Sequence, residues 1–445
     1  MKILTRGLLL LFCLVLPQIA SAKKWTLEEC ISYALANNIS LQKTRINRLS
    51  AHEDVLQAKA DLWPSLNAQT SQSLVWQPFP ETGRYTVNNG TVEASIDKVY
   101  YNGSYGLNLN WTVWNGNRNR NQIKADKLIE EQAVLDSAMT ANSIQEQIVQ
   151  LYIQILYSAD AIDVYKQSLL TSKKNEERGK VMVEVGKMSR ADMAQLSAQR
   201  AQDEYNIVAA ESTLSNYKRQ LKQLLEITDN EEFDVLTPTE MRENALQDIP
   251  SMSVVYDRAL THRPEIRSQE LAIEQSEVNL SIAKAQGLPT ISVTSGIGSN
   301  TTSMSDNGWG KQMKNNLNMS AGVTVSVPIL DNRQRQTAVN KARLAKESSI
   351  LELRNQHTQL YSTIENYWLQ AVTNQSKYRA ALTNTESQQM SYEMLSEQFR
   401  LGLKNIIELM NGKTNLLTAQ QSELESKYLT LYNIKMLQFY QNGDL

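Results

Sequence analysis

The chain has 445 residues, of which 41% are hydrophobic and 21% charged, so it can bury a large core. Its 45 Lys and Arg are balanced by 47 Asp and Glu, without the basic stripe of a nucleic-acid-binding protein, so no nucleic-acid partner is expected. Three His and two Cys without ligand spacing argue against a metal site, and the absence of a phosphate loop or nucleophile elbow argues against an enzyme or a cofactor.

The N-terminus is predicted to be a secretory signal peptide, residues 1–22. Two cations, Lys2 and Arg6, precede an apolar run at 7–16, and small residues at 20–22 offer a cleavage site. The mature chain then keeps one thiol, Cys30, which is predicted to be a small residue of a helix. No later stretch approaches about 18 uninterrupted apolar residues, so any membrane crossing would have to consist of strands.

The mature chain is predicted to contain two repeats. The first occupies 23–227 and the second 251–445, and an acidic, proline-bearing connector or equatorial segment at 228–250 joins them. The motif Ala-Lys-Ala followed by a proline occurs in both halves, and Gly186 of the first half corresponds to Gly402 of the second. Only 9 Pro and 17 Gly in the whole chain indicate long elements with few turns.

Each repeat is predicted to begin with a helix of about 37 residues. In the first repeat this helix starts at Thr26, where Thr-Leu-Glu-Glu forms a capping box, and in the second it starts near Ser251. Both helices are expected to end before a proline, Pro64 or Pro289, because the residue before proline avoids the α region.

After two strands and a polar loop, each repeat is predicted to continue as a helix of nearly 70 residues, 118–185 or 332–401, and a last helix, 189–227 or 405–440. Apolar residues in the long helix step by three and four, which is coiled-coil spacing. At 1.5 Å per residue the long helix would span roughly 100 Å. Helices alone would therefore also fit an exported coiled-coil rod.

The strands decide between these interpretations. Apolar and polar residues alternate at 107–113, 290–294 and 322–327, and more weakly at 65–70. This alternation is typical of transmembrane β-barrel strands, although a soluble sheet with one wet face shows the same pattern. Two observations favour the barrel. Five of the seven Trp lie near the strand ends, and the long loops at 77–104 and 298–320 are rich in Asn, Gly, Ser and Thr. The residues predicted to face lipid are Leu107, Leu109, Trp111, Val113, Ile291, Val293, Val323, Val325 and Val327.

Four strands cannot close a barrel, because about eight are needed. Two chains would give eight strands and a filled interior, whereas three would give twelve and an open lumen. The predicted fold is therefore mainly α with a small β part. It is a trimeric 12-stranded transmembrane barrel, four strands per chain, continued by a long periplasmic α-helical barrel.

Three motifs carry a resemblance to a known family. They are Trp25-Thr26-Leu27-Glu28-Glu29-Cys30-Ile31, then Leu62-Trp63-Pro64-Ser65-Leu66 with its echo Gly287-Leu288-Pro289-Thr290-Ile291, and Val327-Pro328-Ile329-Leu330-Asp331-Asn332-Arg333 with its echo Trp111-Thr112-Val113-Trp114-Asn115-Gly116-Asn117-Arg118. The chain resembles the TolC-like outer-membrane efflux family over essentially its whole mature length, with Cys30 where similar proteins usually have Ala.

This resemblance implies a homotrimer in the outer membrane of a Gram-negative bacterium, in contact with outer-membrane lipid and with helices extending into the periplasm. It would be the passive exit duct for a periplasmic adaptor (membrane fusion protein) and an inner-membrane transporter. Multidrug efflux, heavy-metal efflux and type I protein secretion remain open, and the scattered placing of the 14 Met disfavours the metal version. The alternative from another class is a periplasmic coiled-coil scaffold or adhesin without a pore.

The turns between the last two helices of each repeat align residue for residue. In each, a glycine stops one helix, Ser189 or Asn405 caps the next, and Asp192 or Glu408 at the third position is expected to complete a capping box. Capping alone accounts for both carboxylates.

The family resemblance gives these turns a second role as the closed periplasmic tip that contacts the adaptor. The residues so implied are Gly186, Lys187, Met188, Ser189, Asp192, Gly402, Leu403, Lys404 and Asn405. Glu408 matches an acidic position at the constriction of the channel. The second acidic position of that gate is here Asn411, which puts a double acidic ring in doubt.

Overall fold

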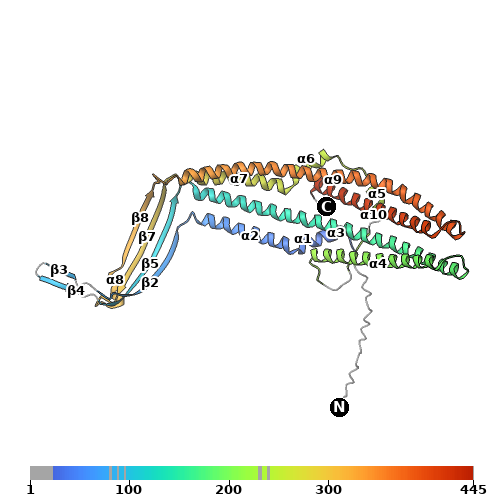
Figure 1. Ribbon diagram of the computed structural model, residues 1–445. Helices are drawn as coiled ribbons and strands as arrows, with labels where there is room; N and C mark the ends of the chain where they lie inside the picture. The colour runs from blue at the N-terminus through green and yellow to red at the C-terminus, as the bar shows by residue number, and fades with distance from the viewer. Residues whose placement is uncertain are drawn as a thin grey trace, which may run out of the picture. The chain divides into compact units, whose positions relative to one another are not determined.

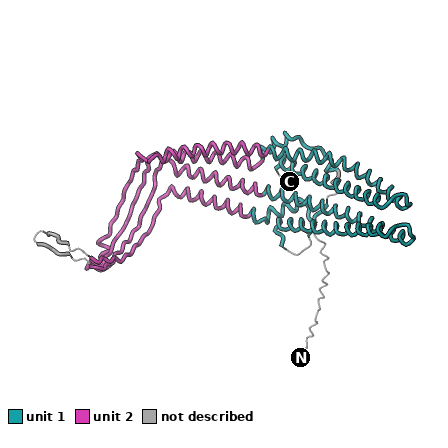
Figure 2. The backbone as a smooth tube through the Cα atoms, in the orientation of Figure 1, with its two compact units in different colours: residues 1–41, 141–262, 361–445 teal, residues 42–140, 263–360 magenta. Residues whose placement is uncertain are grey.

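The computed structural model describes residues 24–79, 83–87, 90–94, 97–228, 233–237 and 241–443, and the predicted signal peptide lies outside them. The chain divides into two compact units, shown in different colours in Figure 2. Unit 1 is made of residues 1–41, 141–262 and 361–445, and unit 2 of residues 42–140 and 263–360.

The chain is mainly helical with a small β part, as predicted (Figure 1). The helices are α1 (Leu27–Asn37), α2 (Ile39–Ala60), α3 (Arg118–Glu184), α4 (Arg190–Leu224), α5 (Met241–Ala245), α6 (Met252–His262), α7 (Pro264–Ala285), α8 (Trp309–Asn315), α9 (Gln334–Arg400) and α10 (Ile406–Asn442). The strands are β1 (Lys24–Trp25), β2 (Ser65–Trp76), β3 (Gly83–Val87), β4 (Gly90–Ala94), β5 (Val99–Trp114), β6 (Asp234–Val235), β7 (Thr290–Thr302) and β8 (Asn318–Ser326). The prediction of two helices of nearly 70 residues is confirmed, since α3 and α9 have 67 residues each.

The prediction of a single helix at the start of each repeat is wrong, because both are broken. Asn38 leaves the helical region with ψ 127° between α1 and α2, and its side chain accepts the amide of Ser40 at 2.9 Å and donates to the carbonyl of Leu224 at 3.0 Å. Arg263 is extended between α6 and α7 because Pro264 follows it. The capping box at Thr26 is confirmed.

Unit 1 is held together by a core to which α1, α3, α4 and α10 contribute. Ile148, Ile155 and Leu221 are almost completely buried in it. Cys30 of α1 has no exposed surface and lies in the same core, so the prediction of a small helix residue is confirmed. No helix among the described residues combines the length and the apolar character that a membrane span requires.

Unit 2 contains a four-stranded antiparallel sheet in the order β2-β5-β7-β8. Among the residues that the structure describes, its outer strands, β2 and β8, each pair on one side only. The turns from β5 to α3 and from β8 to α9 have two consecutive left-handed residues at corresponding places, Gly116 and Asn117 in the first and Asn332 and Arg333 in the second. Two short strands, β3 and β4, form a separate hairpin.

Candidate functional site

The two helix hairpins of unit 1, α3–α4 and α9–α10, end in turns of the same construction. Gly186 has φ 72° and Gly402 has φ 75°, so both are the predicted left-handed stops. The next amide in each turn donates back across it, from Lys187 to the carbonyl of Met182 at 2.7 Å and from Leu403 to that of Gln398 at 2.9 Å. These bonds satisfy carbonyls that the helix end would otherwise leave without partners.

The second turn carries a complete capping box at the start of α10. The amide of Glu408 donates to Asn405 Oδ1 at 2.9 Å, and the amide of Asn405 donates to Glu408 Oε2 at 3.1 Å. Lys404 donates to the other carboxylate oxygen at 2.5 Å. The bond from Lys404 and the backbone bond from Asn405 hold the pKa of Glu408 below its ordinary value of 4.5.

The prediction of the same box in the first turn is wrong. The amide of Asp192 donates to Ser189 Oγ at 3.0 Å, but the reciprocal bond is not among those formed by the described residues. A capping box needs Glu or Gln at this position, and the aspartate side chain is one carbon shorter. Ser189 therefore caps α4 alone.

The turns expose apolar side chains around these caps. Val185, Leu401, Leu403 and Ile407 are each at least 60% exposed. Exposed apolar groups gathered at one end of a protein typically mark a binding surface. We call these four side chains the tip patch.

Behind the tip patch lies a small core that uses methionine as filler. Its buried members include Leu196, Phe399 and Leu409, and Met182, Met188, Met193 and Met410 pack against it. These four methionines are therefore clustered, and packing against the buried core explains why they lie together. Among the described residues there is no group of three His, Cys, Asp or Glu that could hold a metal ion.

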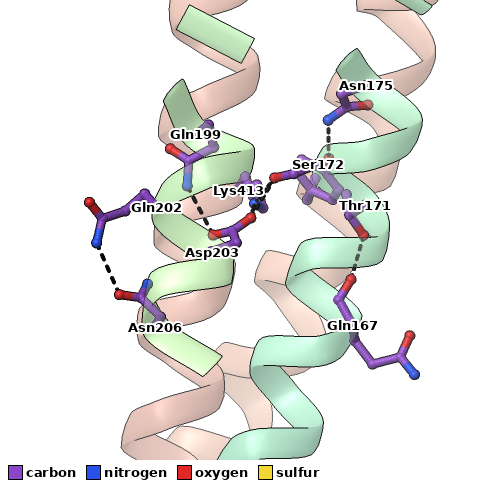
Figure 3. Close-up of polar contacts among 10 residues, drawn as sticks. Gln167, Thr171, Ser172, Asn175, Gln199, Gln202, Asp203, Asn206 and Lys413 are labelled. Carbon is purple, nitrogen blue, oxygen red and sulfur yellow. Dashed lines mark hydrogen bonds and ion pairs between the residues drawn. The ribbon is translucent and has the colours of Figure 1, made fainter. Parts of the chain in front are cut away.

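A buried ion pair joins the two hairpins just beyond this core (Figure 3). Lys413 of α10 contacts Asp203 of α4, and their side chains are 7% and 1% exposed. Ser172 of α3 donates to the same carboxylate oxygen at 2.5 Å, while Gln199 donates to the other at 3.1 Å. Lys413 also donates to Ser172. Burial lowers the pKa of Lys413, and the ion pair with Asp203 opposes that shift.

Sequence reasoning missed this cluster, although the sequence contains a signal for it. Ile406, Leu409, Lys413 and Leu416 step by three, four and three along α10, so Lys413 occupies a seam position of the heptad pattern. A single polar residue at such a position typically fixes the register of packed helices, at a cost in stability.

Further polar contacts tie α10 to α3 in the same register. Gln421 donates to Tyr165 Oη at 2.7 Å. About two turns further along α10, Lys427 and Tyr428 both donate to Asp160, at 2.9 and 2.7 Å. A shift of one helix along the other would break all of these bonds together.

In unit 2 the sheet separates apolar from polar side chains by face. Cross-strand pairs place Leu107 opposite Ile297, Trp111 opposite Val293, and Val293 opposite Val323. Thr112, Ser292 and Thr324 form a polar row on the other face. Antiparallel partners point to the same side of a sheet, so the apolar residues of the strands share one face.

Two of the predicted lipid-facing residues lie outside this regular pattern. Val113 lies in a β-bulge between Thr112 and Trp114, which places Trp114 opposite Ile291. Val327 follows the last residue of β8. Leu109, which pairs with Leu66, and Val325, which pairs with Ile291, belong to the regular apolar face.

Aromatic side chains mark both ends of the apolar face. Trp63, Trp111 and Trp114 lie at the end that adjoins the helices, and Trp111 Nε1 donates to the carbonyl of Leu62 at 2.9 Å. Trp76 and Trp309 lie at the opposite end. Two aromatic belts separated by an apolar band are typical of proteins that cross a membrane as strands.

Comparison with known proteins relates the chain to outer-membrane efflux proteins. The model of the family described as "Outer membrane efflux protein" matches residues 30–226 and 255–440. The outer membrane efflux protein BepC of Brucella suis is 21% identical over 407 residues, covering 91% of this chain and 82% of its own. The cation efflux system protein CusC of Escherichia coli is 21% identical over 425 residues, covering 91% and 83%. The crystal structure of the Campylobacter jejuni CmeC outer membrane channel superposes with a TM-score of 0.75 at 19% identity, covering 94% of this chain and 86% of its own.

Proposed function

The chain belongs to the outer membrane efflux protein family, and we propose that three copies of it form one channel. It is an outer-membrane efflux protein of a Gram-negative bacterium and a passive channel, not an enzyme. Its partners are those of a tripartite efflux system, an adaptor in the periplasm and a pump in the inner membrane.

The observation that best supports a trimer is the four-stranded sheet, whose two edge strands have no further partner strand among the described residues. The outer sides of β2 and β8 present a row of backbone groups that no strand of the same chain satisfies within the described residues. In a membrane such edges are very costly, and only closure into a barrel removes them. Three sheets joined edge to edge supply twelve strands, enough for an open lumen.

In this assembly the apolar face of the sheet would contact lipid and the polar face would line the lumen. The row at Thr112, Ser292 and Thr324 supports this orientation, because water-filled barrels are lined by polar side chains. The matching left-handed turns at Gly116 and Asn332 support the division into repeats at 23–227 and 251–445 with a connector at 228–250.

At the other functional region, the adaptor would bind the tip patch together with the turn residues Gly186 to Ser189, Asp192, and Gly402 to Asn405. Glu408 and Asn411 lie one turn apart on the same side of α10 and would face the constriction. Lys404 already pairs with Glu408, so three such carboxylates could approach one another with part of their charge compensated.

Disulfide cross-linking in the membrane tests the trimer. In a Cys30→Ala background, Cys at Ala68 of β2 is combined in turn with Cys at Ala321, Val323 or Val325 of β8, all on the same face. We expect covalent dimers and trimers and nothing larger, in the outer-membrane fraction. A ladder beyond three chains, or a protein found only in the soluble periplasm, would exclude the closed trimer and favour a coiled-coil scaffold.

A further inference from the structure

The loop between β7 and β8 folds back onto the sheet as the short helix α8, and Gln312 fixes it there. This side chain is 6% exposed. It donates to the carbonyls of Thr302 and Asn307 at 3.0 and 2.5 Å and accepts the amide of Thr302 at 2.7 Å. A buried amide with three bonds holds the helix in one position.

The helix lies over the apolar face of the sheet and not over the polar one. Ser299, which is on the same face as Ile297, donates to the carbonyl of Met313 at 2.9 Å. Trp309 Nε1 donates to Tyr105 Oη at 3.1 Å, and the two rings meet edge to face. In Figure 1, α8 lies at the end of the sheet away from the long helices.

A shallow pocket of about 370 Å³ opens on this face between α8 and the strands. Its lining side chains are largely apolar: Ala68, Leu107, Ile297, Met313 and Leu317. Leu107 and Ile297 are also members of the face that we place against lipid, so the pocket continues that surface. A lipid chain lying along the sheet would enter it without leaving an apolar environment.

The short helix α8, whose Met313 lines the pocket, also carries two cations. Lys311 and Lys314 of α8 are exposed and three residues apart, and the ammonium group of neither forms a hydrogen bond or ion pair with another described residue. The loop 303–317 contains these two lysines against one acid, Asp306. Trp309 beside them is 58% exposed, as expected of a ring at a membrane–water interface.

We propose that this pocket binds one acyl chain of an anionic membrane lipid, whose headgroup phosphate is held by Lys311 and Lys314. The inference rests on the proposed orientation of the apolar face toward lipid. A chain in the pocket and a phosphate on the lysines would be bound together, because basic residues beside an apolar surface select anionic lipids. Free phosphate would contact only the two lysines, without an acyl chain in the pocket, so it would bind more weakly than the lipid.

Native mass spectrometry of the delipidated, full-length protein in detergent tests the proposal. The probes are phosphatidylglycerol and phosphatidylcholine with identical chains. We expect the wild type to prefer the anionic lipid on the order of tenfold or more, the effect of two lysines near a phosphate. K311Q/K314Q should bind the two lipids about equally. The control K124Q/K127Q, which removes two exposed lysines of the same spacing from α3, should keep the preference.

A second variant separates the chain from the headgroup. Ala68→Phe fills the pocket with an apolar side chain, so it should weaken both lipids by the same factor and leave their ratio unchanged. Equal affinity of the wild type for both lipids, or an unchanged preference in K311Q/K314Q, would overturn the site. Displacement of the lipid by millimolar inorganic phosphate would show a plain anion site and would also overturn it.

Channel recordings distinguish failure of the lipid site from failure of the function on which it rests. A wild type that conducts in planar bilayers but binds both lipids equally contradicts only the lipid site. A wild type that neither inserts nor conducts contradicts the proposed channel itself.

Discussion

Replacing Lys413 by Met should destabilise unit 1 more than any other conservative change at the hairpins. The substitution keeps an unbranched side chain, one atom shorter, but leaves Asp203, which is 1% exposed, without its counter-charge. Removing one partner of a buried ion pair costs about 3–5 kcal/mol, because the remaining charge stays buried. In a cooperative unit of the size of unit 1, that corresponds to a fall of roughly 6–20 °C in the thermal midpoint.

The double replacement Lys413→Met with Asp203→Leu should recover most of this loss. Well-packed apolar residues in place of a buried ion pair are often neutral or stabilising by about 1–4 kcal/mol. The thermal midpoint, followed by far-ultraviolet circular dichroism in detergent at pH 7, should therefore return to near the wild-type value. The three variants and the wild type form a double-mutant cycle.

The cost of Asp203→Leu alone should depend on pH. Burial already lowers the pKa of Lys413, and removing Asp203 takes away the interaction that opposes this shift. The unfolded chain then binds more protons than the folded one, so the stability of this variant should rise from pH 7 towards pH 10, more steeply than that of the wild type.

Additive losses in the double variant would refute this reasoning, since they would mean that the two charges do not depend on each other. So would single variants whose midpoints stay within about 2 °C of the wild type, because a change that small is inconsistent with an uncompensated buried charge.

Three further predictions concern the strands and the tip. Met319→Arg places a cation on the apolar face opposite Ile297, in the middle of β7 and away from both aromatic belts, at a cost of about 2–4 kcal/mol near the bilayer midplane. It should reduce heat-resistant trimers on unheated gels, whereas Ser320→Arg on the polar face should assemble normally; equal yields would refute the register of β8. Gly402→Val should cost about 1–2 kcal/mol through its backbone alone, because no atom lies within 4 Å of an added Cβ. Limited proteolysis at the turn should therefore accelerate, and it should accelerate less in Gly402→Asn. Unchanged cleavage of both variants would contradict the left-handed stop. The lowered pKa of Glu408 means that its stabilising contribution is present above pH 4.5 and lost as pH falls through the lowered value. Hydrogen exchange in the first turn of α10 should therefore accelerate on acidification relative to Glu408→Gln, and parallel profiles for the two proteins would show that the carboxylate adds nothing.

The sequence was sufficient to predict the long helices, the strands and the glycine stops, because each depends on a local pattern. The alternation from Leu107 to Val113 specifies a strand whatever surrounds it, and glycine at 186 and 402 specifies a left-handed turn. The break at Arg263 could also have been predicted from the sequence, since Pro264 disfavours helix at the preceding residue.

Features that depend on two distant segments could not be predicted in the same way. Lys413 shows a polar residue at a seam position, but only the packing of α4 and α3 against α10 makes Asp203 and Ser172 its partners. The fold of α8 onto the sheet depends on Gln312 meeting Thr302 across the loop, for which the sequence has no periodic signal. The bulge that displaces Val113 likewise arises from strand pairing.

Single-channel recording of the purified protein in planar lipid bilayers tests the central claim most directly. A passive trimeric channel predicts stepwise currents in wild type without any energy source, with a preference for cations that Glu408→Gln reduces. Folded trimers that insert into the bilayer and pass no current, either as wild type or with the tip loosened by Gly402→Val, would contradict the account.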